Sequence, residues 1–325
     1  MESISPEIHI QILDHLSIKH LIRFSIVSKY FLALIRNYYW NFIIHLSHAK
    51  KETIYDVLST YRFRECDISY RKKIDEIFNG LEPVPGPKVL KLSYCWTSGK
   101  CLHLFSQLSE LYLRHSDGLL DESIVLLCQT RTRPFCKIDL GHCTNGITDI
   151  SLEAIAQIGS DVLDISSNPK ITDIGVQKIV ASGKIRKLHL CGNGQLTEAA
   201  FDGITGVESL NLKKCNVTDD ILKKMGMCNR LDLEYCNITD DGLLQLSRCS
   251  HLRLGANHQI TLDGLITLLH RGTIRKLYIN MFLLPWDKCI ELAGMFPEVK
   301  IAEISIDDCI LRYIRKKRKF DLIDF

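Results

Sequence analysis

Cysteine and histidine are the residues of this chain that could form a nucleophilic or a metal-binding site. The 325-residue sequence contains 13 cysteines and 12 histidines. The pairs His142-Cys143 and His189 with Cys191 combine the residue types of a Cys–His nucleophile or of a metal ligand set. The number of cysteines is odd and none forms a C-x-x-C motif, so neither a disulfide framework nor a zinc finger is predicted.

Other features narrow the classes of function. The sequence has no P-loop, no G-x-G-x-x-G before a helix, no nucleophile elbow and no H-E-x-x-H. Its net charge of +3 exerts no general attraction on nucleic acid. No apolar run reaches the roughly 20 residues of a membrane span, and the first residues lack the basic region of a secretory signal. We therefore expect no enzyme, no cofactor or metal, and neither nucleic acid nor membrane as a partner.

The elements that position the cysteines recur as an internal repeat. Each unit has an L-x-L core, and we take its second apolar residue as the anchor of a coil. The anchors are 21 to 27 residues apart, within the roughly 20–29 residues of a leucine-rich repeat. They are Leu92, Leu113, Leu140, Ile165, Leu190, Leu212, Leu233, Leu254, Ile279 and Ile306.

The third position after each anchor forms a second column, which we call the turn column. Eight of its ten residues are Cys or Asn, and Ser116 and Phe282 depart from the pattern. An Asn amide hydrogen-bonds along a stack of coils, and a thiol fills the same buried slot. The pattern resembles the cysteine-containing subclass of leucine-rich repeats. The column comprises Cys95, Ser116, Cys143, Asn168, Asn193, Cys215, Cys236, Asn257, Phe282 and Cys309.

This column changes the interpretation of the Cys–His pairs. A thiol buried in a structural turn is inert, so we expect no catalytic or metal-binding role for Cys143. Reduced thiols place the protein in the cytoplasm or the nucleus.

The second half of each unit fits a helix, because Thr148, Thr172, Thr218 and Thr239 each precede an acidic residue and an apolar stretch. Such a Thr caps a helix, and the acid favours the positive end of its dipole.

Residues 1–45 have helical periodicity and too few residues for a core of their own. Their motifs resemble an F-box in order and spacing, although Pro6 stands one place late and an aromatic residue follows Val-Ser-Lys one residue early. The motifs are Ile4-Ser5-Pro6-Glu7-Ile8, Ile12-Leu13-Asp14-His15-Leu16, Leu21, Val27-Ser28-Lys29-Tyr30-Phe31 and Trp40. The resemblance implies that this head binds a Skp-family adaptor through Ile4, Pro6, Ile8, Ile12, Leu13, Leu16, Leu21, Val27 and Trp40. The alternative is that several of them only hold the head together.

The predicted fold is an α/β leucine-rich-repeat solenoid, a horseshoe with a parallel inner sheet and convex helices, preceded by a small all-α F-box. We expect the F-box at 1–45, a helical linker at 46–88 with helices near 52–61 and 70–78, about ten coils at 89–311 and a basic tail at 312–325. The tail contains Arg312, Arg315, Lys316, Lys317, Arg318 and Lys319. It fits a solubilising cap or, alternatively, a nuclear-import or anion-binding patch.

The resemblance implies a non-catalytic substrate-recognition subunit of a Skp–cullin–F-box ubiquitin ligase, linked through the adaptor to cullin and RING subunits. The alternative is a ligase-independent binding scaffold in which the head caps the first coil. Strand geometry turns the residues one before, one after and three before each anchor toward the concave face, where a protein target would bind.

Basic and aromatic residues recur on this face and favour an acidic or phosphorylated target segment. The alternative is a solvated strand face interspersed with Asp139, Asp164 and Asp232. The candidate target-binding residues are Tyr112, Lys187, His189, Lys213, Arg230, Arg253, Lys276 and Tyr278.

Overall fold

The structure is a computed structural model. It describes residues 5–16, 20, 23, 28–37, 39–60, 62–84, 86–204, 206–225, 228–280 and 283–303. The chain divides into two compact units, Met1–Gly146 and Ile147–Phe325. Within the described ranges, no helix has both the length and the apolar character needed to cross a bilayer.

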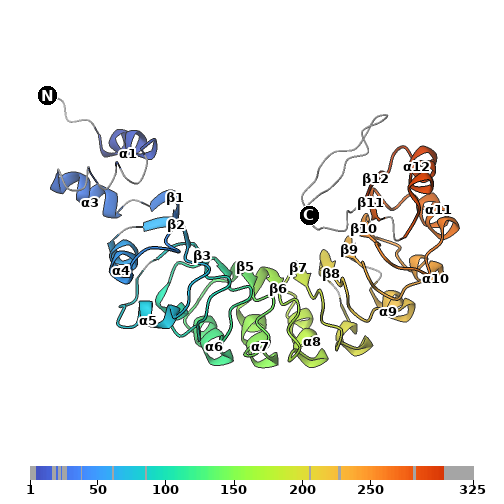
Figure 1. Cartoon of the computed structure of the whole chain (residues 1–325), viewed down its shortest axis with the longest axis horizontal. Coiled ribbons are helices and arrows are strands. Elements are labelled where there is room, and N and C mark those ends of the chain that lie inside the picture. Colours follow the sequence, from blue (N-terminus) through green and yellow to red (C-terminus); the bar gives the residue numbers. More distant parts are fainter. Residues whose placement is uncertain are drawn as a thin grey trace. The chain divides into compact units, whose positions relative to one another are not determined.

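In the first unit, each strand pairs in parallel with the next strand along the chain. Figure 1 shows the strands on one side of these coils and the helices on the other. The strands are β1 (Tyr39–His45), β2 (Arg62–Asp67), β3 (Val89–Lys91), β4 (Glu110–Tyr112) and β5 (Phe135–Asp139). The helices are α1 (Pro6–Asp14), α3 (Lys29–Asn37), α4 (Lys51–Thr60), α5 (Ile74–Phe78), the 3-10 helix η1 (Leu102–Leu104) and α6 (Asp121–Gln129).

Strands β1 and β2 correct the predicted organisation of residues 39–88. The sequence predicted an all-α head to residue 45 and a helical linker to residue 88. Helices α4 and α5 lie where helices were expected, but β1 occupies the end of the head and β2 lies inside the linker. The β1 sequence is rich in aromatic and β-branched residues, which favour a strand. The repeat array therefore begins two strands earlier than its first predicted anchor.

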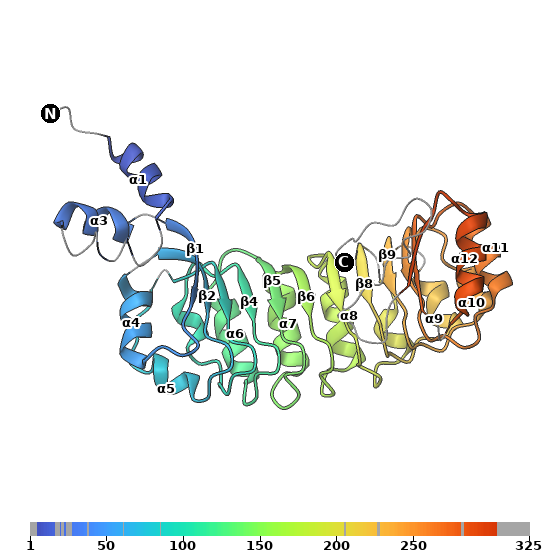
Figure 2. The same cartoon turned by 45° about the horizontal axis from the view of Figure 1, so that its top comes forward.

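The second unit repeats the same strand-and-helix coil. Its strands again pair in parallel in chain order, and Figures 1 and 2 both place its helices on the side opposite the sheet. The strands are β6 (Ser160–Asp164), β7 (Lys187–His189), β8 (Ser209–Asn211), β9 (Arg230–Asp232), β10 (His251–Arg253), β11 (Lys276–Ile279) and β12 (Lys300–Glu303). The helices are α7 (Asp149–Ile158), α8 (Asp173–Ala181), the 3-10 helix η2 (Glu198–Phe201), α9 (Asp219–Lys224), α10 (Asp240–Leu243), α11 (Leu262–His270) and α12 (Trp286–Met295).

The anchors form the core of the repeats. From Leu92 to Ile279, every predicted anchor is at most 1% exposed. The last predicted anchor is wrong, because β12 pairs Glu303 with Ile279 and so sets the register three residues before Ile306. Cys309, assigned to the turn column from Ile306, lies outside the described residues. The predicted α/β leucine-rich-repeat solenoid is confirmed.

Candidate functional site

The turn column is a ladder of hydrogen bonds between coils. Ser116 Oγ donates to the carbonyl of Leu92 at 2.8 Å, so this predicted departure performs the column's function. The other bonds run in the same way, from a turn residue to the anchor carbonyl of the preceding coil. They join Cys95 to Ile68 (3.4 Å), Cys143 to Leu113 (3.0 Å), Asn193 to Ile165 (3.0 Å), Cys215 to Leu190 (3.1 Å), Cys236 to Leu212 (3.4 Å) and Asn257 to Leu233 (2.8 Å). Phe282 lies outside the described residues.

These thiols are poor nucleophiles because they are buried and have raised pKa values. Burial raises the pKa of Cys143 and of Cys215 to about 12, whereas a reactive cysteine needs a lowered pKa. Burial also raises the pKa of Cys191. Among the residues that the structure describes, no group of three His, Cys, Asp or Glu is placed to hold a metal ion. All described cysteines are free thiols.

The Thr-Asp pairs link neighbouring coils as well as capping helices. Thr148, Thr172 and Thr239 accept a backbone N–H as predicted, whereas Thr218 stands at the N-cap without a side-chain bond. The following Asp also bonds to the Thr of the next coil. Asp240 Oδ1 accepts from Thr261 N at 2.8 Å, and its Oδ2 accepts from Thr261 Oγ1 at 2.6 Å. Asp149, Asp173 and Asp219 make the same pair of bonds to Thr172, Thr197 and Thr239.

The sequence analysis assigned these acids only to the helix dipole and missed their bonds to the next coil. Their recurrence at one position of successive coils was the available signal. These Asp–Thr bonds require a glycine on the next helix, because a Cβ at Gly264 would lie 1.9 Å from Asp240 Oδ1. Gly175 and Gly242 stand in the same relation to Asp149 and Asp219.

The head separates the predicted adaptor residues into exposed and buried ones. Ile8 is 48% exposed and Ile12 is 54% exposed, both on α1, and Pro6 at the start of that helix is also exposed. Leu13 is only 2% exposed and forms a small core with Ile35.

Leu13 therefore holds the head together, which corrects its assignment to the adaptor surface. Leu16 packs against the same core. Trp40 lies in β1, in a strand where the sequence predicted helix. Ile4, Leu21 and Val27 fall outside the described residues.

Two of the predicted basic target-binding residues are neutralised within the second unit. Lys213 Nζ lies 3.0 Å from Glu234 Oε2, and Arg253 Nη2 lies 2.9 Å from Glu234 Oε1. Arg253 also contacts Asp232 at 3.2 Å. Glu234 is 1% exposed, so these cations compensate a buried charge. The expectation that Lys213 and Arg253 attract an acidic target is corrected accordingly.

The aspartates expected on a solvated strand face are buried instead. Asp139, Asp164 and Asp232 are 7–8% exposed. Each accepts a hydrogen bond from the backbone N–H two residues later, at 2.9 to 3.2 Å. Burial raises the pKa of Asp232 to about 6, with Arg253 acting in the opposite direction. Their role is to order the turn after the strand, and they add little to the surface.

The aromatic candidates also differ from expectation. Tyr278 is 6% exposed, which removes it as an anchor for a target. Tyr112 is half-buried, and its hydroxyl group bonds to Glu110 at 2.9 Å. The ammonium groups of Lys91 and Lys137 lie 5.5 and 4.7 Å from its ring centre. His189 Nδ1 lies 4.0 Å from Asp164 Oδ2.

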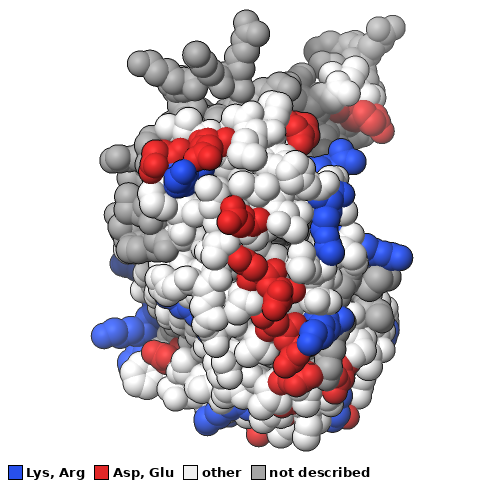
Figure 3. All heavy atoms as spheres, turned by 90° about the vertical axis from the view of Figure 1, so that its right-hand side faces the viewer, with Lys and Arg blue, Asp and Glu red and all other residues white. Residues whose placement is uncertain are grey.

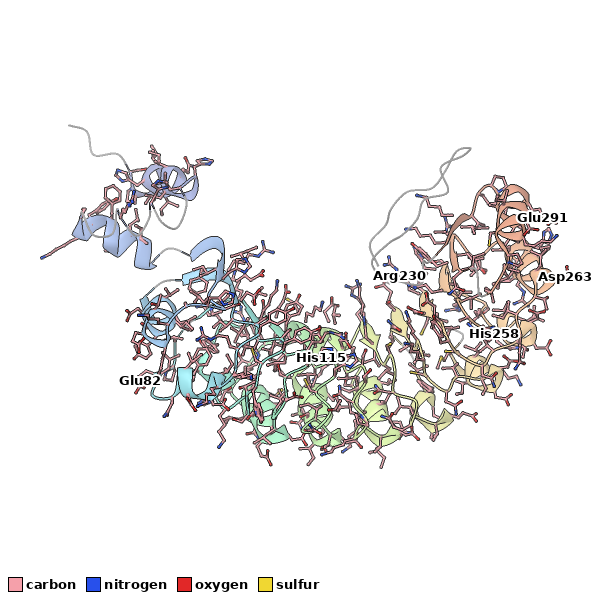
Figure 4. The ribbon with its side chains drawn as sticks, in the orientation of Figure 1. Glu82, His115, Arg230, His258, Asp263 and Glu291 are labelled. Carbon is pink, nitrogen blue, oxygen red and sulfur yellow. The ribbon has the colours of Figure 1, made fainter. Side chains whose placement is uncertain are left out.

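Three predicted basic residues share the first position of their strands. Lys187, Arg230 and Lys276 begin β7, β9 and β11 and are half-buried. Figure 4 shows Arg230 on the strand side of the second unit and Asp263 and Glu291 on its helix side. Figure 3, which views the C-terminal end, shows acidic side chains gathered in a stripe. Acids in the first turns of α9 to α12 contribute to the acidic character of the helix side.

An aromatic column in the first unit was not predicted. Tyr70, Tyr94, His115 and His142 stack successively, with ring centres 4.2 to 4.9 Å apart. Each lies two residues after an anchor and has a φ between 56 and 65°. This left-handed conformation costs roughly 1–2 kcal/mol per residue, and stacking offsets part of that cost. Their common position after the anchors was the available signal.

The repeats and the head geometry define the class of protein as a leucine-rich-repeat solenoid with a helical N-terminal head. The F-box domain family matches residues 1–42, and a family described as Leucine Rich repeat matches residues 162–180, 207–226 and 229–247. The chain is therefore an F-box and leucine-rich-repeat protein. A search of curated proteins finds no match.

Two solved structures share the fold. One is the crystal structure of the Rad7 and Elc1 complex in yeast, with a TM-score of 0.53, 14% identity, and coverage of 90% of this chain and 89% of that chain. The other is the TLR13–ssRNA13 complex, with a TM-score of 0.50, 16% identity, and coverage of 68% of this chain and 33% of that chain. At these identities the likeness extends to the fold.

Proposed function

We propose that this chain is the substrate-recognition subunit of a Skp–cullin–F-box ubiquitin ligase. The F-box binds a Skp-family adaptor, the adaptor joins the cullin and RING subunits, and the repeats hold the target protein. The chain itself is a non-catalytic receptor.

The exposure of Ile8 and Ile12 carries the proposal. They lie four residues apart in the F-box match and stand on one face of α1. Leu13 on the same helix supplies the head's own core, so Ile8 and Ile12 are not needed there. An exposed apolar helix face fits recognition by a partner groove. In the Rad7 and Elc1 structure, a protein of the same fold is in complex with a partner, which adds support.

The target surface in this proposal is the sheet face opposite the helices. Solenoids use such extended surfaces for binding. The pairing of Lys213 and Arg253 with buried acids leaves the strand-initial basic residues as the candidates for attracting an acidic or phosphorylated segment. A cytoplasmic or nuclear location remains part of the proposal and is supported by the thiols of the turn column, whose donor hydrogens oxidation would remove.

Co-purification of the tagged full chain from its host cell tests this function. Wild type should bring down a Skp-family adaptor and cullin, and Ile8→Asp with Ile12→Asp should lose both. The matched control is Ile150→Asp with Ile174→Asp, because these isoleucines are each 60% exposed on the repeats. Capture of a target without any adaptor would instead support the ligase-independent scaffold.

A further inference from the structure

A row of basic side chains crosses the last strands of the second unit. Arg230, His251, Lys276 and Lys300 begin β9, β10, β11 and β12, and the parallel pairing places them side by side in this order. The backbones of adjacent members are about 4.8 Å apart across the sheet, because this is the spacing of paired strands. All are half-buried. We call Arg230, His251 and Lys276 the basic triad.

The electrostatics of the triad differ from those of the neighbouring cations. Lys213 and Arg253 lie against acidic side chains, whereas Arg230 Nε is buried without a hydrogen-bond partner. Burial and the nearby charges of Arg230, Lys276 and Arg275 lower the pKa of His251 to about 4. Burial, Lys300 and Arg230 lower the pKa of Lys276. An anion over the triad would relieve this repulsion.

We propose that the basic triad binds the phosphoryl group of a phosphoserine or phosphothreonine in the target. This inference rests on the proposed function, because it assigns the target to this sheet face.

The geometry favours a phosphoryl group over a single carboxylate. Arg230 and Lys276 flank the His251 strand, and their backbones are about 10 Å apart across the sheet. Their long side chains can converge on one group above β10. A phosphomonoester carries about −1.5 to −2 charges and three acceptor oxygens, one for each member of the triad. A carboxylate has half the charge and two oxygens.

His251 provides a reporter inside the site. Its Nδ1 lies 2.7 Å from Ser250 Oγ, which orients the ring. A bound dianion favours the imidazolium form, so ligand binding should raise the pKa of His251. A nonspecific increase in ionic strength would act on all exposed histidines alike.

The first measurement is NMR of the full chain labelled at the histidine rings, titrated with sodium phosphate against sodium chloride at equal ionic strength. Phosphate should shift the His251 signal saturably and raise its pKa, while exposed His258 follows ionic strength alone. Arg230→Gln and Lys276→Gln should each weaken phosphate binding by roughly tenfold, the typical loss for a charge-assisted hydrogen bond. The matched control is Arg248→Gln, since Arg248 is exposed. An equal response to chloride would overturn the site.

The second measurement identifies the ligand. The full chain is challenged with a degenerate phosphoserine peptide library, the same library with Asp or Ser in its place, and a short single-stranded RNA. Preferential capture of phosphopeptides, lost in Arg230→Gln, supports the proposal. Equal capture of Asp peptides, or preference for the RNA, contradicts it. Adaptor binding by the wild-type chain separates the two hypotheses. A wild-type chain that binds the adaptor but captures no phosphopeptide refutes the triad alone, and a wild-type chain that binds no adaptor refutes the ligase function. Retained adaptor binding by Arg230→Gln shows that its loss of phosphopeptide capture is not a folding defect.

Discussion

Replacing Gly264 by Ala should change stability in opposite directions depending on Asp240. Gly264 lies in α11 with an ordinary helical backbone, and the three atoms nearest to an added Cβ all belong to Asp240. In a helix, Ala is favoured over Gly by about 1 kcal/mol. In the wild type, however, the new Cβ must displace the Asp240 carboxylate from both of its bonds to Thr261.

The expected magnitudes follow from these opposing effects. Loss of the two bonds costs about 2 kcal/mol in total, at about 1 kcal/mol for each, because both bonds are exposed and water competes for the same groups. Gly264→Ala alone should therefore destabilise the chain by about 1 kcal/mol, because the helix gain of about 1 kcal/mol offsets half the loss. In an Asp240→Ala background the same change should stabilise it by up to about 1 kcal/mol. The coupling between the two sites is then about 2 kcal/mol.

Urea unfolding of the purified full chain, followed by circular dichroism, gives the four free energies of the cycle. The comparison is sound where the dependence on urea is unchanged between variants. If Gly264→Ala has the same effect in both backgrounds, to within about 0.5 kcal/mol, the proposed stabilisation by the Asp240–Thr261 bonds between coils is refuted.

Four further measurements test the turn column. Asn257→Ala should lower the free energy of unfolding by at least about 2 kcal/mol, because it leaves the carbonyls of Leu233 and Leu254 buried without this donor. The control in the same urea assay is Asn216→Ala, since Asn216 is exposed. Equal losses of stability in the two variants would contradict the role of the turn column. Cys143 should resist iodoacetamide at pH 8, since the Cys143 thiol is buried and has a raised pKa, while the exposed Cys136 reacts. Equal labelling rates of the two cysteines, measured by mass spectrometry, would disprove this. The raised pKa of Cys143 also means that its contribution to stability is retained below about pH 9 and lost as the pH rises toward 12, because the unfolded chain loses this proton first. Unfolding of the wild type and of Cys143→Ser over a series of alkaline pH values checks this. Cys215→Arg should cost several kcal/mol by burying an unpaired charge, and unchanged thermal unfolding would argue against its burial.

The repeats were predictable because the same residue types return at one position of most coils. The anchors and the turn column follow directly from that spacing. The first two coils escaped prediction because their turn residues are neither Cys nor Asn. Arg71 takes the position in the second coil, and its guanidinium Nη1 donates to the carbonyl of Leu46 at 3.2 Å. A long cation thus replaces a short amide without preserving the sequence pattern.

The charges on the sheet face were harder to predict because their effect depends on pairs between neighbouring coils. Lys213 and Glu234 each follow their anchor by one residue and therefore lie side by side. Arg253 and Asp232 likewise each precede their anchor by one residue. Counting cations along one column missed these partners. The sequence also could not show that Ile8 is exposed while Leu13 is buried. This difference depends on how α1 packs against α3, which helical periodicity alone does not specify.

The central claim is that the F-box of this chain binds a Skp-family adaptor. Calorimetric titration of the purified full chain with the purified adaptor of its host measures this directly. The account predicts saturable binding at one adaptor per chain, abolished by Ile8→Asp with Ile12→Asp and unaffected by Ile150→Asp with Ile174→Asp. Absence of binding by the folded wild-type chain would contradict the claim.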